Sequence, residues 1–177
     1  MNIKWHIMLI CFVVSLVIFG GMFIIIEEQF IQSPIQDEIM EIDGVKNVSY
    51  ENNRNNAKII IHLDYVSNFN DTHAQIVNIL KMQGIYEESS LIIEDNRNEK
   101  LEELAYYIKP ALYEGAREGN YRELQDYILE RTSHYEINNN RFFVNESYIN
   151  VQAKDGNSYL YISIPIVHKE GEDEFVH

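Results

Sequence analysis

The residues best suited to metal chemistry lie close together in the first half of the chain. His62 and Asp64 are two residues apart in a predicted strand, which puts both side chains on one face of it. His73 follows in the first turn of a predicted helix. A metal site needs three or four converging ligands, and no second group of ligand-type residues accompanies these. The other histidines lack HExxH-like spacing. The sequence therefore predicts an ordinary strand end and turn, without a bound metal.

No sequence pattern is typical of a catalytic centre. There is no G-x-S-x-G motif, Cys11 lies within a long apolar run, and Ser89-Ser90 has no obvious base beside it. Neighbouring carboxylates such as Glu87-Glu88 and Glu102-Glu103 could act in acid–base catalysis, but adjacent acidic residues are far more often solvated surface charges. We therefore expect no enzyme activity and no cofactor.

Tyrosine is concentrated in the second half of the chain, where nine of the 12 lie between positions 106 and 161. A tyrosine has an apolar body and a polar tip, which suits protein interfaces and sugar stacking. The three in the last predicted hairpin lie on the strand face opposite Ile149 and Leu160. That face is either covered by packing or forms an exposed patch. We take as the candidate interaction surface Tyr106, Tyr107, Tyr113, Tyr148, Tyr159 and Tyr161.

Apolar spacing predicts an α-β-β-α-β order over residues 33–95. Ser33-Pro34 is a typical helix start, and Asp43-Gly44 is a typical helix end. Strands are expected at 45–50, 58–63 and 91–94, with a second helix that Asp71 caps. The first two strands would form a hairpin, and both helices would cover one face of a three-stranded sheet.

Residues 96–167 are expected to form an α-α-β-β-β unit. Asn96 or Asn98 caps the first helix, and Pro110 predicts a kink or a break within it. Asn120 and Glu123 resemble a capping box at the start of the second helix. Alternating residues then predict strands, with Asp155-Gly156 at a hairpin turn. The acidic tail, 168–177, is expected to fray.

The N-terminal region predicts a membrane anchor. Residues 5–26 carry no formal charge and would span about 33 Å as a helix, enough to cross a bilayer core. Their length favours an uncleaved anchor over a signal peptide. Lys4 and Trp5 would lie at the cytoplasmic interface, and Glu27 and Glu28 on the far side, where 27–32 form an acidic stalk. Residues 1–4 would then be cytoplasmic and the rest extracytoplasmic.

The net charge of the chain limits its partners. With 14 basic and 28 acidic residues, the charge of −14 argues against nucleic acid, because phosphate binding depends on Lys and Arg. A single cysteine excludes a disulfide framework within one chain. The abundance of Asn, Ile and Tyr, whose codons are rich in A and T, indicates a bacterial source. The remaining partners are the lipid bilayer, through 5–26, and a membrane or envelope protein or a second copy.

A membrane anchor followed by α-β-β-α-β, with Gly44-Val45-Lys46-Asn47-Val48 entering the first strand, resembles the ring-building motif of envelope-spanning secretion and sporulation assemblies. The resemblance covers residues 33–95, rests on the order of the elements, and implies self-association. The sequence thus predicts an α+β, single-pass membrane protein whose exported part makes protein contacts without catalysis. The alternative is a module that binds a small ligand or cell-wall glycan through its tyrosines.

Overall fold

A computed structural model describes residues 9, 12–17, 33–53, 56–86 and 91–167, which form an α+β structure with two three-stranded sheets. Most of the predicted anchor (5–26) lies outside these residues, as do Lys4, Trp5, Glu27, Glu28, the stalk and the tail. Within the described residues, none of the helices has both the length and the apolar character needed to cross a bilayer.

The first unit has the predicted α-β-β-α-β order. It consists of α2 (Ser33–Met40), β1 (Val45–Asn53), β2 (Asn56–Leu63), α3 (Phe69–Met82) and β3 (Leu91–Glu94). The strand order is β1-β2-β3, in which β1 and β2 form an antiparallel hairpin and β3 is parallel to β2. The crossover through α3 makes this parallel pairing possible.

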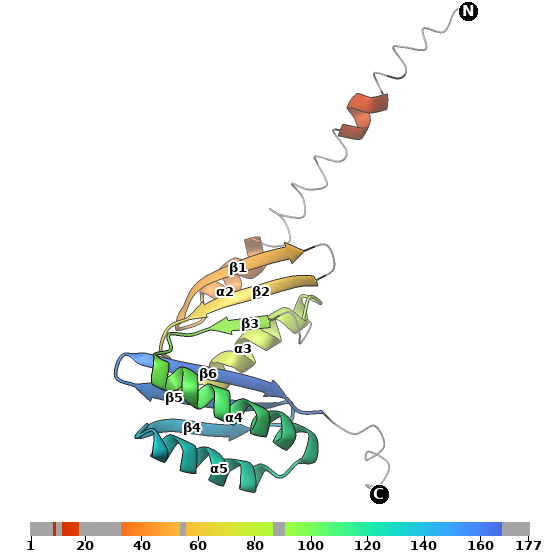
Figure 1. Cartoon of the computed structure of the whole chain (residues 1–177). Coiled ribbons are helices and arrows are strands. Elements are labelled where there is room, and N and C mark those ends of the chain that lie inside the picture. The colour runs from red at the N-terminus through yellow and green to blue at the C-terminus, as the bar shows by residue number, and fades with distance from the viewer. Residues whose placement is uncertain (1–8, 10–11, 18–32, 54–55, 87–90, 168–177) are drawn as a thin grey trace, which may run out of the picture.

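The core of the first unit lies between its sheet and its two helices (Figure 1). Val48 and Ile61 pair across the hairpin, point to the helices and are almost fully buried. Ile39 of α2 and Ile76 of α3 cover them and are themselves inaccessible to solvent. Both helices therefore cover one sheet face with their apolar stripes, as predicted.

Gly44 shows why the chain needs a glycine between α2 and β1. Its φ of 88° lies in the left-handed region, which side-chain-bearing residues rarely adopt. A Cβ added there would lie 2.2 Å from Cγ1 of Val66. This position therefore requires glycine both for its backbone conformation and for the close approach of the loop after β2.

The second unit has the predicted α-α-β-β-β order. It consists of α4 (Glu99–Glu118), α5 (Tyr121–His134), β4 (Asn139–Val144), β5 (Tyr148–Asp155) and β6 (Ser158–Pro165). All three strands are antiparallel, in the order β4-β5-β6. The helices cover the sheet face that carries Ile149 and Leu160, and residues such as Leu104 and Ile108 fill the space between.

Two predicted helix caps are wrong, and of the two alternatives predicted at Pro110, a kink or a break, the break does not occur. Helix α4 continues through Pro110 as a single element of 20 residues. Pro110 lies on the exposed side, where the carbonyl that loses its N–H partner can bind water. The Asn120 side chain accepts no capping hydrogen bond and instead donates to the Glu123 carboxylate, at 3.4 Å. Helix α3 begins before Asp71, with Asn68 at the N-cap position.

The two units meet where β3 ends beside β6 (Figure 1). The Tyr159 N–H donates to the Asn96 carbonyl at 2.8 Å, and the Tyr161 N–H donates to the Asp95 carboxylate at 2.7 Å. Arg97 holds that carboxylate with two hydrogen bonds of 2.7 and 3.0 Å. The segment that links the two units therefore provides hydrogen-bond partners for backbone N–H groups on the β6 edge of the second sheet.

Candidate functional site

The structure divides the six candidate tyrosines into two groups. Tyr148, Tyr159 and Tyr161 are only 8%, 8% and 2% exposed. Tyr106, Tyr107 and Tyr113, all on α4, are 75%, 42% and 60% exposed. The hairpin tyrosines therefore do not form an exposed patch, which corrects the interpretation of all six as one interaction surface.

The buried group belongs to the contact between the units, which we call the seam. The Tyr161 ring stacks on Phe69 of α3, with ring centroids 4.5 Å apart. Its hydroxyl accepts a hydrogen bond from the Val66 N–H at 2.8 Å and donates to the Asp64 carbonyl at 3.1 Å. Burial raises the pKa of Tyr161 well above the ordinary tyrosine value. The first unit covers this strand face, whereas α4 and α5 cover the other.

Polar side chains fix how the seam fits together. Gln152, 2% exposed, donates to the Val66 carbonyl at 2.6 Å and accepts from the Phe69 N–H at 3.0 Å. Asn150 donates to the Asn70 side chain at 2.9 Å. The two Gln152 bonds satisfy backbone groups at and just before the start of α3, whose N-cap residue makes no side-chain capping hydrogen bond. Sequence alternation places Gln152 on this face but gives no sign of its partner.

The exposed group forms what we call the α4 tyrosine face, made of Tyr106, Tyr107, Pro110 and Tyr113. Tyr106, Pro110 and Tyr113 are spaced i, i+4 and i+7, so they share one side of the helix, away from its buried stripe. Tyr107 is turned toward α5 and meets the Tyr106 ring edge-on at 5.4 Å. Its ring also faces the Arg131 guanidinium at 5.5 Å.

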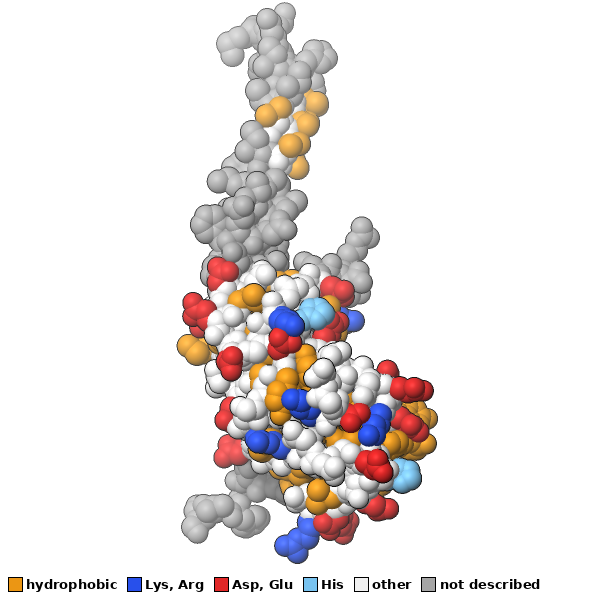
Figure 2. All heavy atoms as spheres, turned by 90° about the vertical axis from the view of Figure 1, so that its left-hand side faces the viewer, with side chains coloured by type: hydrophobic (Ala, Val, Ile, Leu, Met, Phe, Trp, Pro, Cys, Tyr) orange, Lys and Arg blue, Asp and Glu red, His pale blue; other side chains and the backbone are white. Residues whose placement is uncertain are grey.

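A groove of about 410 Å³ beside this face is lined by residues of α4 and α5. Tyr107, Pro110 and Tyr127 contribute apolar surface, and Glu114 and Glu123 contribute negative charge. The α4 tyrosine face therefore combines aromatic surface with carboxylates. Figure 2 shows hydrophobic and acidic side chains next to each other along the right-hand border of the second unit.

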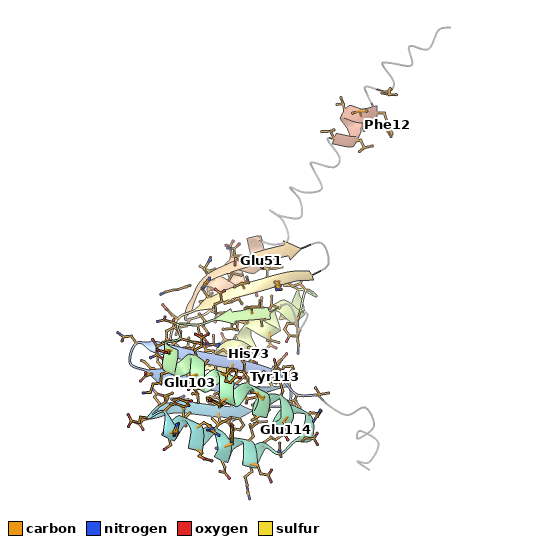
Figure 3. All side chains as sticks on the ribbon, in the orientation of Figure 1. Phe12, Glu51, His73, Glu103, Tyr113 and Glu114 are labelled. Carbon is orange, nitrogen blue, oxygen red and sulfur yellow. The ribbon has the colours of Figure 1, made fainter. Side chains whose placement is uncertain are left out.

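A smaller hollow of about 180 Å³, which we call the inter-unit cleft, lies along the seam. His73 and Tyr148 line it from α3 and β5, Tyr161 and Ser163 from β6, and Lys109 and Tyr113 from α4. Figure 3 shows His73 where the two units meet, with Tyr113 on the neighbouring helix. The tertiary structure thus brings together three of the predicted tyrosines, Tyr113, Tyr148 and Tyr161, with a histidine that sequence reasoning dismissed.

His73 is a strongly perturbed titratable group of the cleft. It is 3% exposed, and burial, with a smaller contribution from Lys81, lowers its pKa to about 4. The ring is therefore neutral at physiological pH, packed edge-on against Tyr148 at 4.8 Å. Its Nδ1 has no hydrogen-bond partner among the described residues, and neither has the buried Ser163 hydroxyl. An unsatisfied buried polar atom costs about 1–3 kcal/mol, so both atoms are unusual.

The residues first considered as metal ligands do not converge. His62 pairs with Glu94 at 2.7 Å on β2 and β3, whereas His73 lies in the cleft. Asp64 pairs with Lys46 at 2.8 Å, and this contact lowers the pKa of the Asp64 carboxyl. No group of three or more potential metal ligands occurs within the part of the chain that the structure describes.

Comparison with known protein families and with curated proteins gave no match for this chain.

Proposed function

We propose that this chain is a single-pass, membrane-anchored module that binds another envelope protein through the α4 tyrosine face. The uncharged run at 5–26 supports the anchor, and the charge step from Lys4 to Glu27 and Glu28 supports an extracytoplasmic location for the rest. An anchored domain meets its membrane partners at a raised effective concentration. Binding without a chemical step is sufficient for this role.

The exposure of three tyrosines on one helix is the observation that carries the proposal. Scattered apolar residues are normal on a surface, but contiguous aromatic ones are typical of protein interfaces. The same helix keeps Leu101, Leu104 and Leu112 fully buried. The tyrosine side is therefore a second, outward-facing apolar stripe that the fold of this unit does not use.

Charge favours a basic partner over a second copy of the chain. The groove beside the face is lined by Glu114 and Glu123, and the whole protein has a net charge of −14. Two such faces would repel each other, whereas a surface rich in Lys or Arg would be attracted. In Figure 1 the second unit lies at the opposite end of the molecule from α2, so its helices would project away from an anchor that precedes Ser33.

Site-specific photocrosslinking in intact cells tests this proposal. A photoreactive amino acid replaces Tyr106 in one variant and, as the control, Glu51 of β1, which is exposed on the first unit (Figure 3). We expect a discrete adduct with another envelope protein from position 106 and none from position 51. Tyr107→Ser should weaken the adduct formed from position 106.

Two results would contradict the proposal in different ways. Equal labelling at both positions, or none at position 106, would show that the α4 tyrosine face binds no protein. An adduct between two copies of this chain would show that the face mediates self-association and does not bind a basic partner. Self-association is what the resemblance to ring-building motifs implies.

A further inference from the structure

The inter-unit cleft differs in charge from the other hollows of this acidic protein. Glu114 and Glu123 line the groove between α4 and α5, and Asp64, Glu94 and Asp95 line a hollow beside β2 and β3. Among the residues that the structure describes, no acidic side chain lines the inter-unit cleft, and its charged residues are Arg97 and Lys109. A positive concavity in a negative protein concentrates anions.

Of these two cations, Lys109 is the one available to a ligand. Arg97 already binds the buried Asp95 carboxylate through two hydrogen bonds and donates to the Tyr161 carbonyl at 3.3 Å. Lys109 is exposed at the mouth of the cleft and forms no ion pair with a described residue. An ammonium in this position can bind a carboxylate without breaking an existing contact.

The cleft also holds polar atoms that a ligand would satisfy. The Nδ1 atom of His73 and the Ser163 hydroxyl are buried, and neither has a partner among the described residues. Both residues line the cleft, and they come from α3 and β6, which belong to different units. Native proteins rarely leave such atoms unpaired, so two of them in one cavity indicate a place for a polar ligand group.

The size of the cleft limits the ligand to a small molecule. Its volume is about 180 Å³, and an engineered apolar cavity of about 150 Å³ holds benzene. Leu91, Ile93 and Ile164 give the wall an apolar part that a ring could pack against. One ring with a few substituents fits, and a glycan chain does not.

We propose that the inter-unit cleft binds a small organic carboxylate of single-ring size, with its carboxylate on Lys109 and a polar substituent at Ser163 and His73. Sugar acids and aromatic acids belong to this class. The site shares Tyr113 with the α4 tyrosine face, but it requires neither Tyr106 nor Tyr107, the two residues on which the photocrosslinking test depends. Binding would place a small molecule across the seam and stabilise the contact between the units.

Matched pairs of probes test this proposal on the full-length chain in detergent micelles. Glucuronate is compared with glucose, and benzoate with benzamide, so that each pair differs in negative charge. The readout is the NMR spectrum of ¹⁵N-histidine-labelled protein, in which His73→Leu identifies the signals of His73. We expect a saturable shift of these signals with at least one carboxylate and none with its neutral counterpart.

Two lysine variants connect the response to the cleft. Lys109→Gln should weaken carboxylate binding by about tenfold or more, because it removes the ammonium that would hold the ligand. Lys58→Gln removes the same charge from an exposed position on β2 and should leave binding unchanged. Unchanged thermal unfolding of Lys109→Gln without ligand would establish that the fold is intact.

Three outcomes would overturn the proposal. They are the absence of a saturable His73 shift with both carboxylates, equal binding of the neutral counterparts, and equal weakening by both lysine variants. None of these results depends on photocrosslinking at position 106, so this proposal and the proposed function can fail separately.

Discussion

Two groups of three tyrosines, similar in the sequence, have opposite fates in the structure. Tyr148, Tyr159 and Tyr161 are buried in the seam, whereas Tyr106, Tyr107 and Tyr113 remain exposed on α4. The difference arises from the elements that carry them. A sheet has two broad faces, and in the second unit α4 and α5 cover one while the first unit covers the other. Helix α4 buries one stripe, and its opposite side has no covering element among the described residues.

The comparison shows that residue type does not distinguish a binding surface from a packing surface. The hairpin tyrosines hold the two units together, because Tyr159 and Tyr161 belong to a hydrophobic cluster that spans both units. The first unit contributes Leu63, Val66 and Phe69 to this cluster. The α4 tyrosines make no comparable contribution to the core. If this division is right, substitutions in the two groups should affect different properties.

Replacing one tyrosine from each group should give the largest contrast. Tyr161→Ala removes a ring stacked on Phe69 and two hydrogen bonds to the loop after β2, and should lower the free energy of unfolding by about 3–5 kcal/mol. Tyr106→Ala should change it by less than about 0.5 kcal/mol. Urea unfolding of the full-length chain in detergent, followed by circular dichroism, measures both. Similar losses in the two variants would contradict the division.

The pH dependence of stability should depend on the buried histidine. Folding lowers the pKa of His73 from 6.5 to about 4, so between these values the unfolded chain binds one more proton than the folded chain. Stability should therefore fall as the pH falls through this window, by up to about 3 kcal/mol. We expect His73→Leu to flatten the curve of unfolding free energy against pH.

His134 provides the matched control, because it is exposed on α5 yet also packs edge-on against a tyrosine, Tyr135, at 5.2 Å. His134→Gln should leave the pH curve unchanged. A curve that His134→Gln flattens and His73→Leu does not would show that the buried ring is not the group responsible.

The smallest of the three effects on stability should come from the Asp95 carboxylate, which lies beside Tyr161 where the two units meet. Asp95→Asn keeps the size of the side chain but removes the charge that pairs with Arg97 and accepts from the Tyr161 N–H. We expect a loss of about 2 kcal/mol in unfolding free energy. Glu118→Gln removes a carboxylate from the exposed pair with Arg117 and should cost less than about 0.5 kcal/mol. Equal losses would mean that Asp95 does not join the units.

Local patterns in the sequence predicted most of the secondary structure. Leu101, Leu104 and Ile108 repeat at helical spacing, and α4 buries all three. Asn98 caps that helix as expected, accepting a hydrogen bond from the Leu101 N–H at 3.0 Å. Helix α4 continues through Pro110 without a break because a proline on a solvated helix face loses one hydrogen bond that water can replace.

The candidate site was less predictable than the fold. His73 was predicted correctly on a helix, but no local signal shows that Tyr148 and Ser163 lie along the same cleft. Gln152 likewise forms hydrogen bonds with Phe69 and Val66, which precede it by 83 and 86 positions in the sequence. Long-range contacts of this kind leave no periodic pattern in the sequence, because each of these side chains could form similar contacts with many other residues.

The order of helices and strands and the faces that carry apolar residues can be predicted from local patterns alone, because hydrophobic spacing, caps and turns act over a few residues. Two features are visible only in the folded molecule: the first unit covers the tyrosine face of the last hairpin, and α4 keeps its own tyrosines exposed. Both sides of the hairpin carry residues that can be buried. Whether a given face packs against α4 and α5 or against the first unit depends on how the two complete units fit together. This packing forms both the seam and the inter-unit cleft.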